Sequence, residues 1–342
     1  MPELGDVSTL MIRSFRMNTS TRRRFLARTL SGAVLASSAS GWDGWNLVPY
    51  VVGANTAITG YGLFQAISLL RELGFPTIEV QNLVGVPEPA PGKFPGFQLD
   101  RASDEDRRKV KQALAGFQHI TAHLPYTGLE YFSPPGPEAD DGIRTLEAAM
   151  RTAAFLGARV AVMHPKPGKG MTLEESWPIM IRRIRRWGDL AKEHGFRLAL
   201  ETSYPRSVAE FVRLVREVDH EHVGATLDVG HQSHYRELLA RVAPGERSTA
   251  KGIRAYNDTN IEIVEGLGAK LIHLHVHDID PATWKEHQPL VYGFVDYPRL
   301  IAKLREVRYE GVMVFEIAGP ADRMRQYLAQ AKRKLEGYLG RA

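Results

Sequence analysis

Four short apolar segments of this chain end in residues that commonly bind metal ions. They place Glu201, Asp228, His275 and Glu316 at or near their carboxyl ends, in the segments LALETS, ATLDVGH, LIHLHVHD and VMVFEI. Apolar, β-prone runs of this length are typical of buried strands. Three carboxylates and one imidazole brought together would form an oxygen-rich site for a divalent cation. The four residues therefore predict a metal-dependent enzyme.

Further histidines share these locations. His123 and His164 end two earlier apolar runs, His231 follows Asp228 by three residues, and His287 lies in the loop after His275. Any one of them alone would be interpreted as a packed or hydrogen-bonded histidine, but the shared location of the set favours a common site. We expect these four histidines to hold a second metal ion or to bind substrate.

One segment carries three alternating histidines, His273, His275 and His277. Alternate residues of a strand point to the same side, so we expect all three side chains to lie on one side of this strand. His273 would lie deepest and is expected to be structural. The position of His277 depends on where the strand ends.

The segments that must position these residues alternate between strand and helix patterns from residue 48 onward. Eight strands are predicted, at Tyr50–Ala54, Thr77–Gln81, His119–His123, Arg159–His164, Arg197–Thr202, Val223–Val229, Lys270–His275 and Val312–Ile317. Helical patterns lie between them, as at Leu63–Leu73, Ile143–Leu156, Glu174–His194 and Pro298–Val307, and Gly74, Gly157, Gly195 and Gly268 follow helices as terminators. Eight strand–helix units predict an α/β fold, a (β/α)8 TIM barrel with parallel strands and the active site at their carboxyl ends. The first strand is not followed by GxGxxG, which disfavours a dinucleotide-binding fold.

Two connections are unusually long. Residues 83–100 are rich in proline and glycine, and residues 243–256 lengthen the connection after the sixth strand. Because both follow strands, both are expected on the face that holds the active site, either as lids or substrate walls or as disordered insertions.

Composition excludes several kinds of chemistry. The 342 residues contain no cysteine, so thiolate catalysis, zinc–cysteine sites and disulfides are absent. The net charge is +5, but residues 1–40 contribute +4 of it through six arginines and two acids, which leaves +1 for the remainder. Proteins that bind duplex DNA usually show a basic face, so we expect no nucleic-acid partner.

The amino end resembles a twin-arginine export signal. The run from Thr21 to Leu26 reads TRRRFL, matching the pattern Ser/Thr-Arg-Arg-x-Phe-Leu, and a small-residue cleavage site is present at Ser37-Ser38-Ala39. The apolar stretch between them is far shorter than the roughly 20 residues of a membrane span, so no stable membrane anchor is expected. The resemblance implies a signal segment at residues 1–40, a barrel at 41–342, the twin-arginine (Tat) export machinery as a partner, and a periplasmic or extracellular location. Met17 as the true start and a disordered basic tail are the alternatives.

The chain from about residue 50 to 318 is similar to the xylose isomerase-like barrel superfamily, which contains sugar isomerases, sugar epimerases and endonuclease IV. The similarity lies in the order of its motifs: LDVGH at 227–231, HVHD at 275–278, Glu286-His287, GFVDY at 293–297, Gly311 and Glu316. The resemblance implies that Glu201, Asp228, His275 and Glu316 bind one divalent metal ion. Mn²⁺ or Zn²⁺ is favoured, and Mg²⁺ or Co²⁺ is compatible with such ligands.

The resemblance also implies a reaction. A metal bound to a sugar carbonyl and its neighbouring hydroxyl acidifies the C–H between them. Glu201 and Glu316 would then act as base and acid, through an enediolate, to isomerise or epimerise a carbohydrate or polyol. The alternative interpretation of both glutamates is a structural ion pair in the barrel mouth.

The chain departs from its relatives in two places. Endonuclease IV holds additional metal ions with histidines that match His123, His164, His231 and His287, but Lys285 stands where a carboxylate ligand is expected and Glu286 is displaced by one residue. The epimerase pattern Gly-x-Gly is replaced by Val291-Tyr292-Gly293. A complete three-metal cluster and the common substrate rim are therefore not expected.

Several functions stay open at this point. A lyase or hydrolase acting on an oxidised, 3-keto glycoside would use the same metal site and the same proton abstraction. A non-catalytic sugar-binding barrel and an AP endonuclease are less favoured, the second because of the export signal and the nearly neutral body. A homo-oligomer is compatible with the sequence.

Export gives a direct test of the amino-terminal interpretation. Replacing Arg22 and Arg23 with lysine keeps the charge but removes the arginine pair that the export machinery recognises. We expect the variant precursor to accumulate in the cytoplasm, measured by cell fractionation against the parent. Normal export and cleavage of the variant would contradict the prediction.

Overall fold

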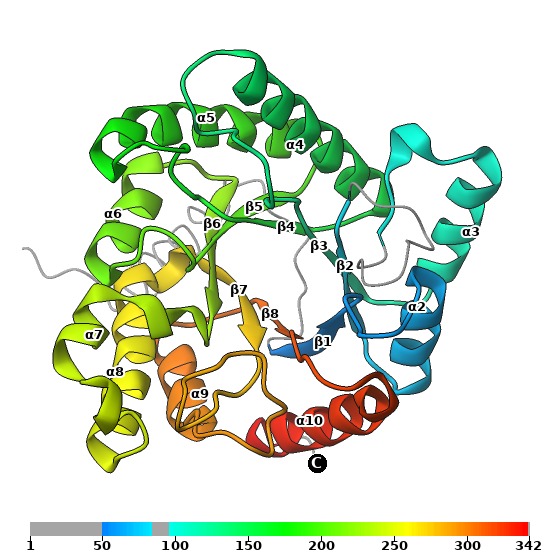
Figure 1. Cartoon of the computed structure of the whole chain (residues 1–342). Coiled ribbons are helices and arrows are strands. Elements are labelled where there is room, and N and C mark those ends of the chain that lie inside the picture. Colours follow the sequence, from blue (N-terminus) through cyan, green and yellow to red (C-terminus); the bar gives the residue numbers. More distant parts are fainter. Residues whose placement is uncertain (1–49, 84–95, 341–342) are drawn as a thin grey trace, which may run out of the picture. The chain divides into compact units, whose positions relative to one another are not determined.

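The structure, a computed structural model, describes residues 50–83 and 96–340. Eight parallel strands form a closed barrel in which each strand pairs with its neighbours in chain order, and β8 closes the ring on β1. Helices surround the barrel (Figure 1). The predicted (β/α)8 TIM barrel is confirmed. The twin-arginine-type segment at residues 1–40 lies outside the described residues.

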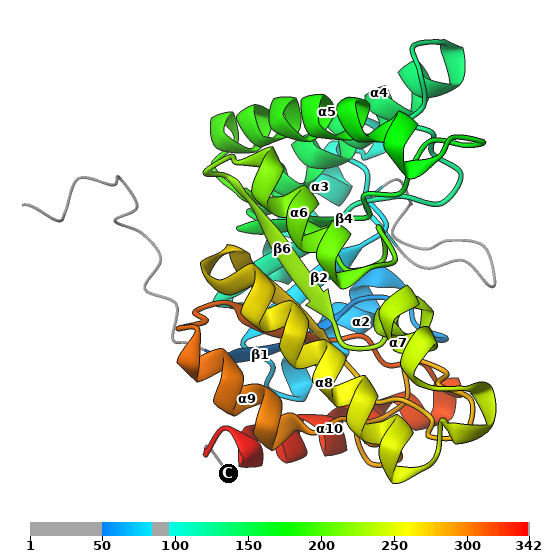
Figure 2. The same cartoon turned by 90° about the vertical axis from the view of Figure 1, so that its left-hand side faces the viewer.

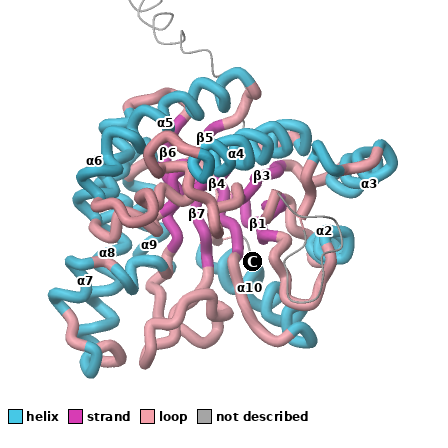
Figure 3. The backbone as a smooth tube through the Cα atoms, turned by 45° about the horizontal axis from the view of Figure 1, so that its top comes forward, coloured by secondary structure: helices cyan, strands magenta, loops and turns pink. Residues whose placement is uncertain are grey.

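The strands lie where the apolar runs predict them, with ends that differ by no more than two residues. They are β1 Val51–Asn55, β2 Thr77–Gln81, β3 His119–His123, β4 Val160–Met163, β5 Arg197–Glu201, β6 Val223–Asp228, β7 Leu271–Val276 and β8 Val312–Phe315. In Figure 3 these strands (magenta) lie inside the helices (cyan).

The helices carry clear local signals at their ends. They are α2 Leu63–Glu72, α3 Asp104–Leu114, α4 Pro137–Leu156, α5 Leu173–Glu193, α6 Val208–Val218, α7 Arg236–Arg241, α8 Ala250–Leu267, α9 Tyr297–Glu306 and α10 Met324–Tyr338. At the start of α5, Thr172 and Glu175 form a reciprocal capping box that satisfies two backbone N–H groups. The four predicted terminator glycines all have positive φ, as expected for residues that end helices. Figure 2 shows α8 and α9 side by side.

The connection after β6 is more helical than the sequence predicts. After β6 the chain forms the short 3-10 helices η2 (His231–His234) and η3 (Pro244–Glu246) on either side of α7, and α8 already begins at Ala250. The second half of the predicted 243–256 loop is therefore helical, because the Thr249 side chain accepts the Gly252 N–H and caps α8. In the connection after β2, residues 84–95 lie outside the described residues, and Leu99–Arg101 form the 3-10 helix η1.

The main apolar core lies between the strands and the surrounding helices. The small apolar cluster of Val51, Val312 and Val314, from the adjacent strands β1 and β8, is separate from it. Inside the barrel, Glu79 on β2 meets His273 on β7, and these strands are not neighbours. The interior of the barrel is therefore substantially polar, in contrast to the branched apolar layers that usually fill such barrels.

Among residues 50–83 and 96–340, no helix is both long and apolar enough to cross a bilayer.

Candidate active site

The four predicted ligands converge at the carboxyl ends of the last four strands. Nδ1 of His275 lies 2.8 Å from Oε1 of Glu201, 3.5 Å from Oε2 of Glu316 and 3.9 Å from Oδ2 of Asp228. All four side chains are buried, with Glu316 the most exposed at 9%. The structure thus brings together the residues that the sequence analysis grouped.

Strand order explains this convergence. Glu201 and Asp228 are the last residues of β5 and β6, His275 is the last but one of β7, and Glu316 directly follows β8. Asp228 and His275 are opposite each other in the β6–β7 pairing. Because every strand is parallel, these ends open on one face of the barrel, where the active sites of this architecture lie.

The burial of so many carboxylates is balanced by imidazoles. Burial opposes ionisation of Glu201, yet His164 and His275 hold the pKa of its carboxyl well below the usual range. Burial raises the pKa of Glu316; His275 opposes this rise and the Glu201 carboxylate adds to it. The two glutamates therefore sit in different electrostatic environments although both approach the same imidazole.

Asp228 is held from several sides. Its Oδ1 accepts the backbone N–H groups of Gly230, at 2.7 Å, and His231, at 3.1 Å. Both of its carboxylate oxygens lie 3.1 Å from Nε2 of His277. The backbone N–H of His287 lies 3.0 Å from Nδ1 of His277, and Nε2 is the nitrogen of this ring that faces Asp228. His277, whose place the sequence left open, lies one residue beyond β7 and positions Asp228.

The donor set fits a divalent cation. Carboxylate oxygens and one imidazole nitrogen are ligands that Zn²⁺ and Mn²⁺ accept. Within the part of the chain that the structure describes, several groups of three histidine or acidic residues have potential ligand atoms within 4.8 Å of one another, and one such group is His123, His275 and Glu316.

A second group, of two histidines, lies on the other side of Glu201. Oε2 of Glu201 is 2.6 Å from Nε2 of His164 and 3.2 Å from Nε2 of His123. Burial opposes protonation of His123, but Glu201 outweighs it and raises the pKa of His123 to about 9. Tyr126 stacks on His164 with ring centroids 3.8 Å apart. This pair either donates hydrogen bonds to Glu201 or, with it, offers three ligands to a second metal ion.

His231 and His287 are also brought to the site, together with Glu286. Their potential ligand atoms lie within 4.8 Å of one another. Glu286 reaches this group although it is displaced by one residue from the expected carboxylate, while Lys285 is exposed. Burial and the neighbouring charge of His277 lower the pKa of His287 to about 3, which keeps this imidazole neutral.

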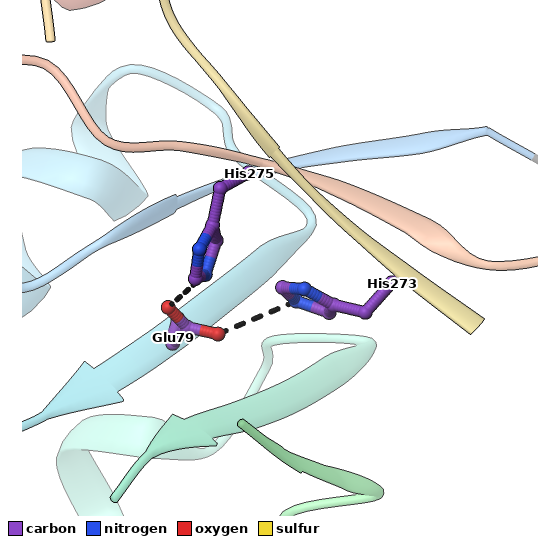
Figure 4. A group of neighbouring side chains, drawn as sticks. All are labelled: Glu79, His273 and His275. Atoms are coloured by element: carbon purple, nitrogen blue, oxygen red, sulfur yellow. Dashed lines mark hydrogen bonds and ion pairs between the residues drawn. The ribbon is translucent and has the colours of Figure 1, made fainter. Parts of the chain in front are cut away.

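Two supporting residues were missed by the sequence analysis. Asn55, at the end of β1, donates from Nδ2 to Oε1 of Glu316 at 2.7 Å. Glu79, inside β2, lies with Oε1 3.0 Å from Nε2 of His275 and close to His273 (Figure 4). A charged residue within the apolar run TIEV was the signal that could have revealed Glu79. Nε2 of His273 lies 3.3 Å from Oε2 of Glu79, and its ring packs edge-on against that of His275 with centroids 5.0 Å apart. The structural role expected of His273 stays a prediction.

A cavity of about 210 Å³ opens at this end of the barrel. Glu201 and Glu316 both line it, as do the histidines His123, His164, His231 and His287. Asp228 and His275 are not among its lining residues. Of the four predicted ligands, only the two glutamates are therefore presented to a molecule bound in the cavity.

The loop after β7 is fixed by Asp278 of the HVHD motif. Its Oδ1 accepts the N–H groups of Ile279 and Val295, each at 3.0 Å. A Cβ atom at Gly293 would lie only 1.9 Å from the same oxygen. The glycine is needed because the backbone passes directly over the carboxyl group.

The family assignment follows from a match over residues 67–335 to the model of the xylose isomerase-like TIM barrel family. The match covers well over half of the chain, and the chain belongs to this family. It is also similar to an uncharacterized protein of Methanocaldococcus jannaschii, with 22% identity over 58% of this chain. The chain spans only 64% of the length of that relative.

Solved structures share the fold. A D-tagatose 3-epimerase-like protein matches with a TM-score of 0.63 and 19% identity over 84% of this chain and 97% of its own. D-psicose 3-epimerase of Clostridium cellulolyticum has a TM-score of 0.62 and 16% identity over 84% and 99%. The 3-keto-D-glucoside 4-epimerase of E. coli has a TM-score of 0.58 and 18% identity over 83% and 99%.

The Asp278–Gly293 contact yields a test of how the loop is built. Replacing Gly293 with alanine forces the Asp278 carboxyl away from its two N–H donors, and overpacking of this kind costs about 1–3 kcal/mol of unfolding free energy. We expect this loss in denaturant titration, with faster hydrogen exchange at Val295. Gly245→Ala is the control, since a Cβ there meets nothing within 4 Å. Equal stability of the two variants would contradict the contact.

Proposed function

We propose that this protein is a metal-dependent sugar isomerase or epimerase in which Glu201 and Glu316 transfer the proton. The proposal depends on which of the four residues line the cavity. All four residues approach one another, but only Glu201 and Glu316 line the space where a substrate would lie. In this proposal Asp228 and His275 bind the metal ion and take no part in proton transfer.

A divalent ion held by the four residues supplies Lewis-acid polarisation of a substrate carbonyl. The two glutamates come from strands that are not neighbours, β5 and β8, so they approach the cavity from different sides. One carboxylate takes the proton from the carbon beside the carbonyl, which gives an enediolate. The other returns a proton to the opposite face or to the adjacent carbon, giving epimerisation or isomerisation.

The protein holds each glutamate in place for this task. His123 and His164 contact Oε2 of Glu201, and Asn55 donates to Oε1 of Glu316. A base positioned by hydrogen bonds loses little freedom when substrate binds, which favours proton transfer. The cavity, at about 210 Å³, suits a small molecule rather than a polymer.

The names of the solved structures support a sugar as substrate. Two of them are named as epimerases, of D-psicose at carbon 3 and of a 3-keto-D-glucoside at carbon 4, and the third is named D-tagatose 3-epimerase-like. At identities below 20% they share the fold with this chain, and the substrate class is the part that we propose.

A 3-keto glycoside is the substrate of our second candidate, a lyase. The first step would be the same, removal of the proton beside the keto group by one glutamate. The carbanion would then expel the glycosidic oxygen from the next carbon, forming a C–C double bond and releasing the alcohol after it takes up a proton. A screen of ketoses, polyols and 3-keto glycosides with the purified mature chain distinguishes the two, since only elimination releases the aglycone.

Export, a periplasmic location and self-association stay predictions from the sequence, and the substrate screen is informative whichever compartment holds the enzyme. The barrel carries no overall basic charge that would favour a nucleic-acid substrate.

Metal binding is the first property to measure. We expect the purified protein to retain one tightly held divalent ion, and His275→Ala to lose most of it because the one imidazole in the ligand set is removed. Elemental analysis after dialysis gives the stoichiometry, with His194→Ala at the end of α5 as the control. Two ions in the parent would favour a second site at His123 and His164. Full retention of metal in His275→Ala would contradict the assigned ligand.

Glutamine substitutions separate catalysis from ligation. Glu201→Gln and Glu316→Gln keep an oxygen ligand and the side-chain size but remove a usable base, so turnover at saturating metal should fall about 10²–10⁴-fold. Exchange of solvent deuterium into the substrate should fall with it. Glu310→Gln, at an exposed residue, is the control.

If a fully metallated variant exchanges deuterium and turns over substrate like the parent, the substituted glutamate is only a metal ligand and not a base or acid. Turnover by the parent without solvent exchange would favour a hydride shift between adjacent carbons.

A further inference from the structure

One buried carboxylate has no part in the proposed proton transfer. Glu79 lies in the middle of β2, and its side chain is fully buried inside the barrel. Transfer of a carboxylate from water into such an interior costs several kcal/mol unless hydrogen bonds and opposite charge compensate it. The partners of Glu79 therefore indicate what this residue does.

The two oxygens of Glu79 have different partners. Oε2 accepts the hydroxyl of Thr121 at 3.1 Å and lies 3.3 Å from Nε2 of His273. Thr121 is also the residue opposite Glu79 in the β2–β3 pairing, so this contact is fixed by strand register. Oε1 is left to face Nε2 of His275 at 3.0 Å (Figure 4).

Both ring nitrogens of His275 face carboxylates. Nε2 faces Glu79, whereas Nδ1 faces Glu201 at 2.8 Å and also Glu316 and Asp228. A metal ion bound among these three carboxylates would take the lone pair of Nδ1 in place of a proton. The remaining N–H, on Nε2, would then donate to Glu79.

We propose that Glu79 is the positioning residue for His275, presenting Nδ1 to the metal ion and fixing the plane of the ring. This inference rests on the proposed metal-dependent function. Carboxylates that accept the second N–H of a liganding histidine orient the ring and increase its basicity, and their loss typically weakens metal binding 10–100-fold. Glu79 would act through His275 and would touch neither metal nor substrate.

Two other roles for Glu79 make different predictions. As a purely structural group it would affect the stability of the barrel and leave metal affinity unchanged. As a metal ligand itself, with His273 and His275, it would bind a separate ion, since these three side chains also lie close enough together. In that case its loss would remove a whole equivalent of metal.

The test compares Glu79→Gln with Thr121→Val in the full chain. Glu79→Gln has nearly the same shape but lacks the charge, and we expect Zn²⁺ affinity, measured by chelator competition, to fall about 10–100-fold at unchanged stoichiometry. Thr121→Val removes the hydroxyl from Oε2 but keeps the Oε1–His275 contact, so its affinity should change much less. Equal affinity of Glu79→Gln and the parent, or a loss of one metal equivalent, would overturn the inference.

A measurement on the unmutated protein covers the case in which Glu79→Gln does not fold. With ¹⁵N-labelled histidine and Cd²⁺ as the probe metal, coupling to cadmium should appear at Nδ1 of His275 while Nε2 retains its proton. Ligation through Nε2 would overturn the inference. A parent that binds neither Zn²⁺ nor Cd²⁺ would instead overturn the proposed function on which it rests.

Discussion

Four carboxylates are buried inside one barrel, and the arrangement of the residues around them depends on compensating their charge. Glu79, Glu201, Asp228 and Glu316 are each at most 9% exposed. Negative charges so close together repel one another and lose their hydration, which no apolar packing can offset. Every one of them has an imidazole within 4 Å. Most of these imidazoles come from strand ends or the loops that follow, and His273 comes from within β7. The buried carboxylates thus need these histidines to compensate their charge, whether or not the histidines also bind a metal ion.

Because of this constraint, the apolar side chains that stabilise the fold and the polar side chains that form the site occupy different regions of the barrel. The small apolar cluster of Val51, Val312 and Val314 and the main core between strands and helices contain the apolar side chains. Along β7, His273 and His275 face the carboxylates while Leu274 belongs to the main core. Because successive side chains of a strand point to opposite faces, one strand contributes both to the apolar core and to the polar site. The polar interior therefore coexists with a large apolar core on the outer side of the strands.

Features that depend on local sequence pattern can be predicted from the sequence, whereas contacts between strands on opposite sides of the barrel cannot. The eight strands and the convergence of the four predicted ligands follow from apolar runs and from the rule that parallel strands end on one face. The partner of His275 does not, because the meeting of β2 and β7 depends on strand stagger and on side-chain direction across the barrel. His277 was uncertain for a related reason, since its role depends on the one residue by which it lies beyond β7. The helical start at Ala250 was missed because its cap, Thr249, lies inside a segment that has the composition of a loop.

The ligand set alone does not select a reaction, because the same carboxylates and imidazole serve any chemistry that needs a polarised carbonyl and a nearby base. Selection must come from the groups that line the cavity without joining the four. Tyr126, Gln81 and His231 lie there; Gln81 ends β2 and Tyr126 follows β3, whereas His231 follows Asp228 by three residues. The lining combines several hydrogen-bonding groups with the apolar residues Ala57, Ile317 and Ala318. This mixture is compatible with the small hydroxylated substrate that we propose. We therefore expect the residues of the rim to determine substrate preference, while the proposed metal site stays the same when that preference changes.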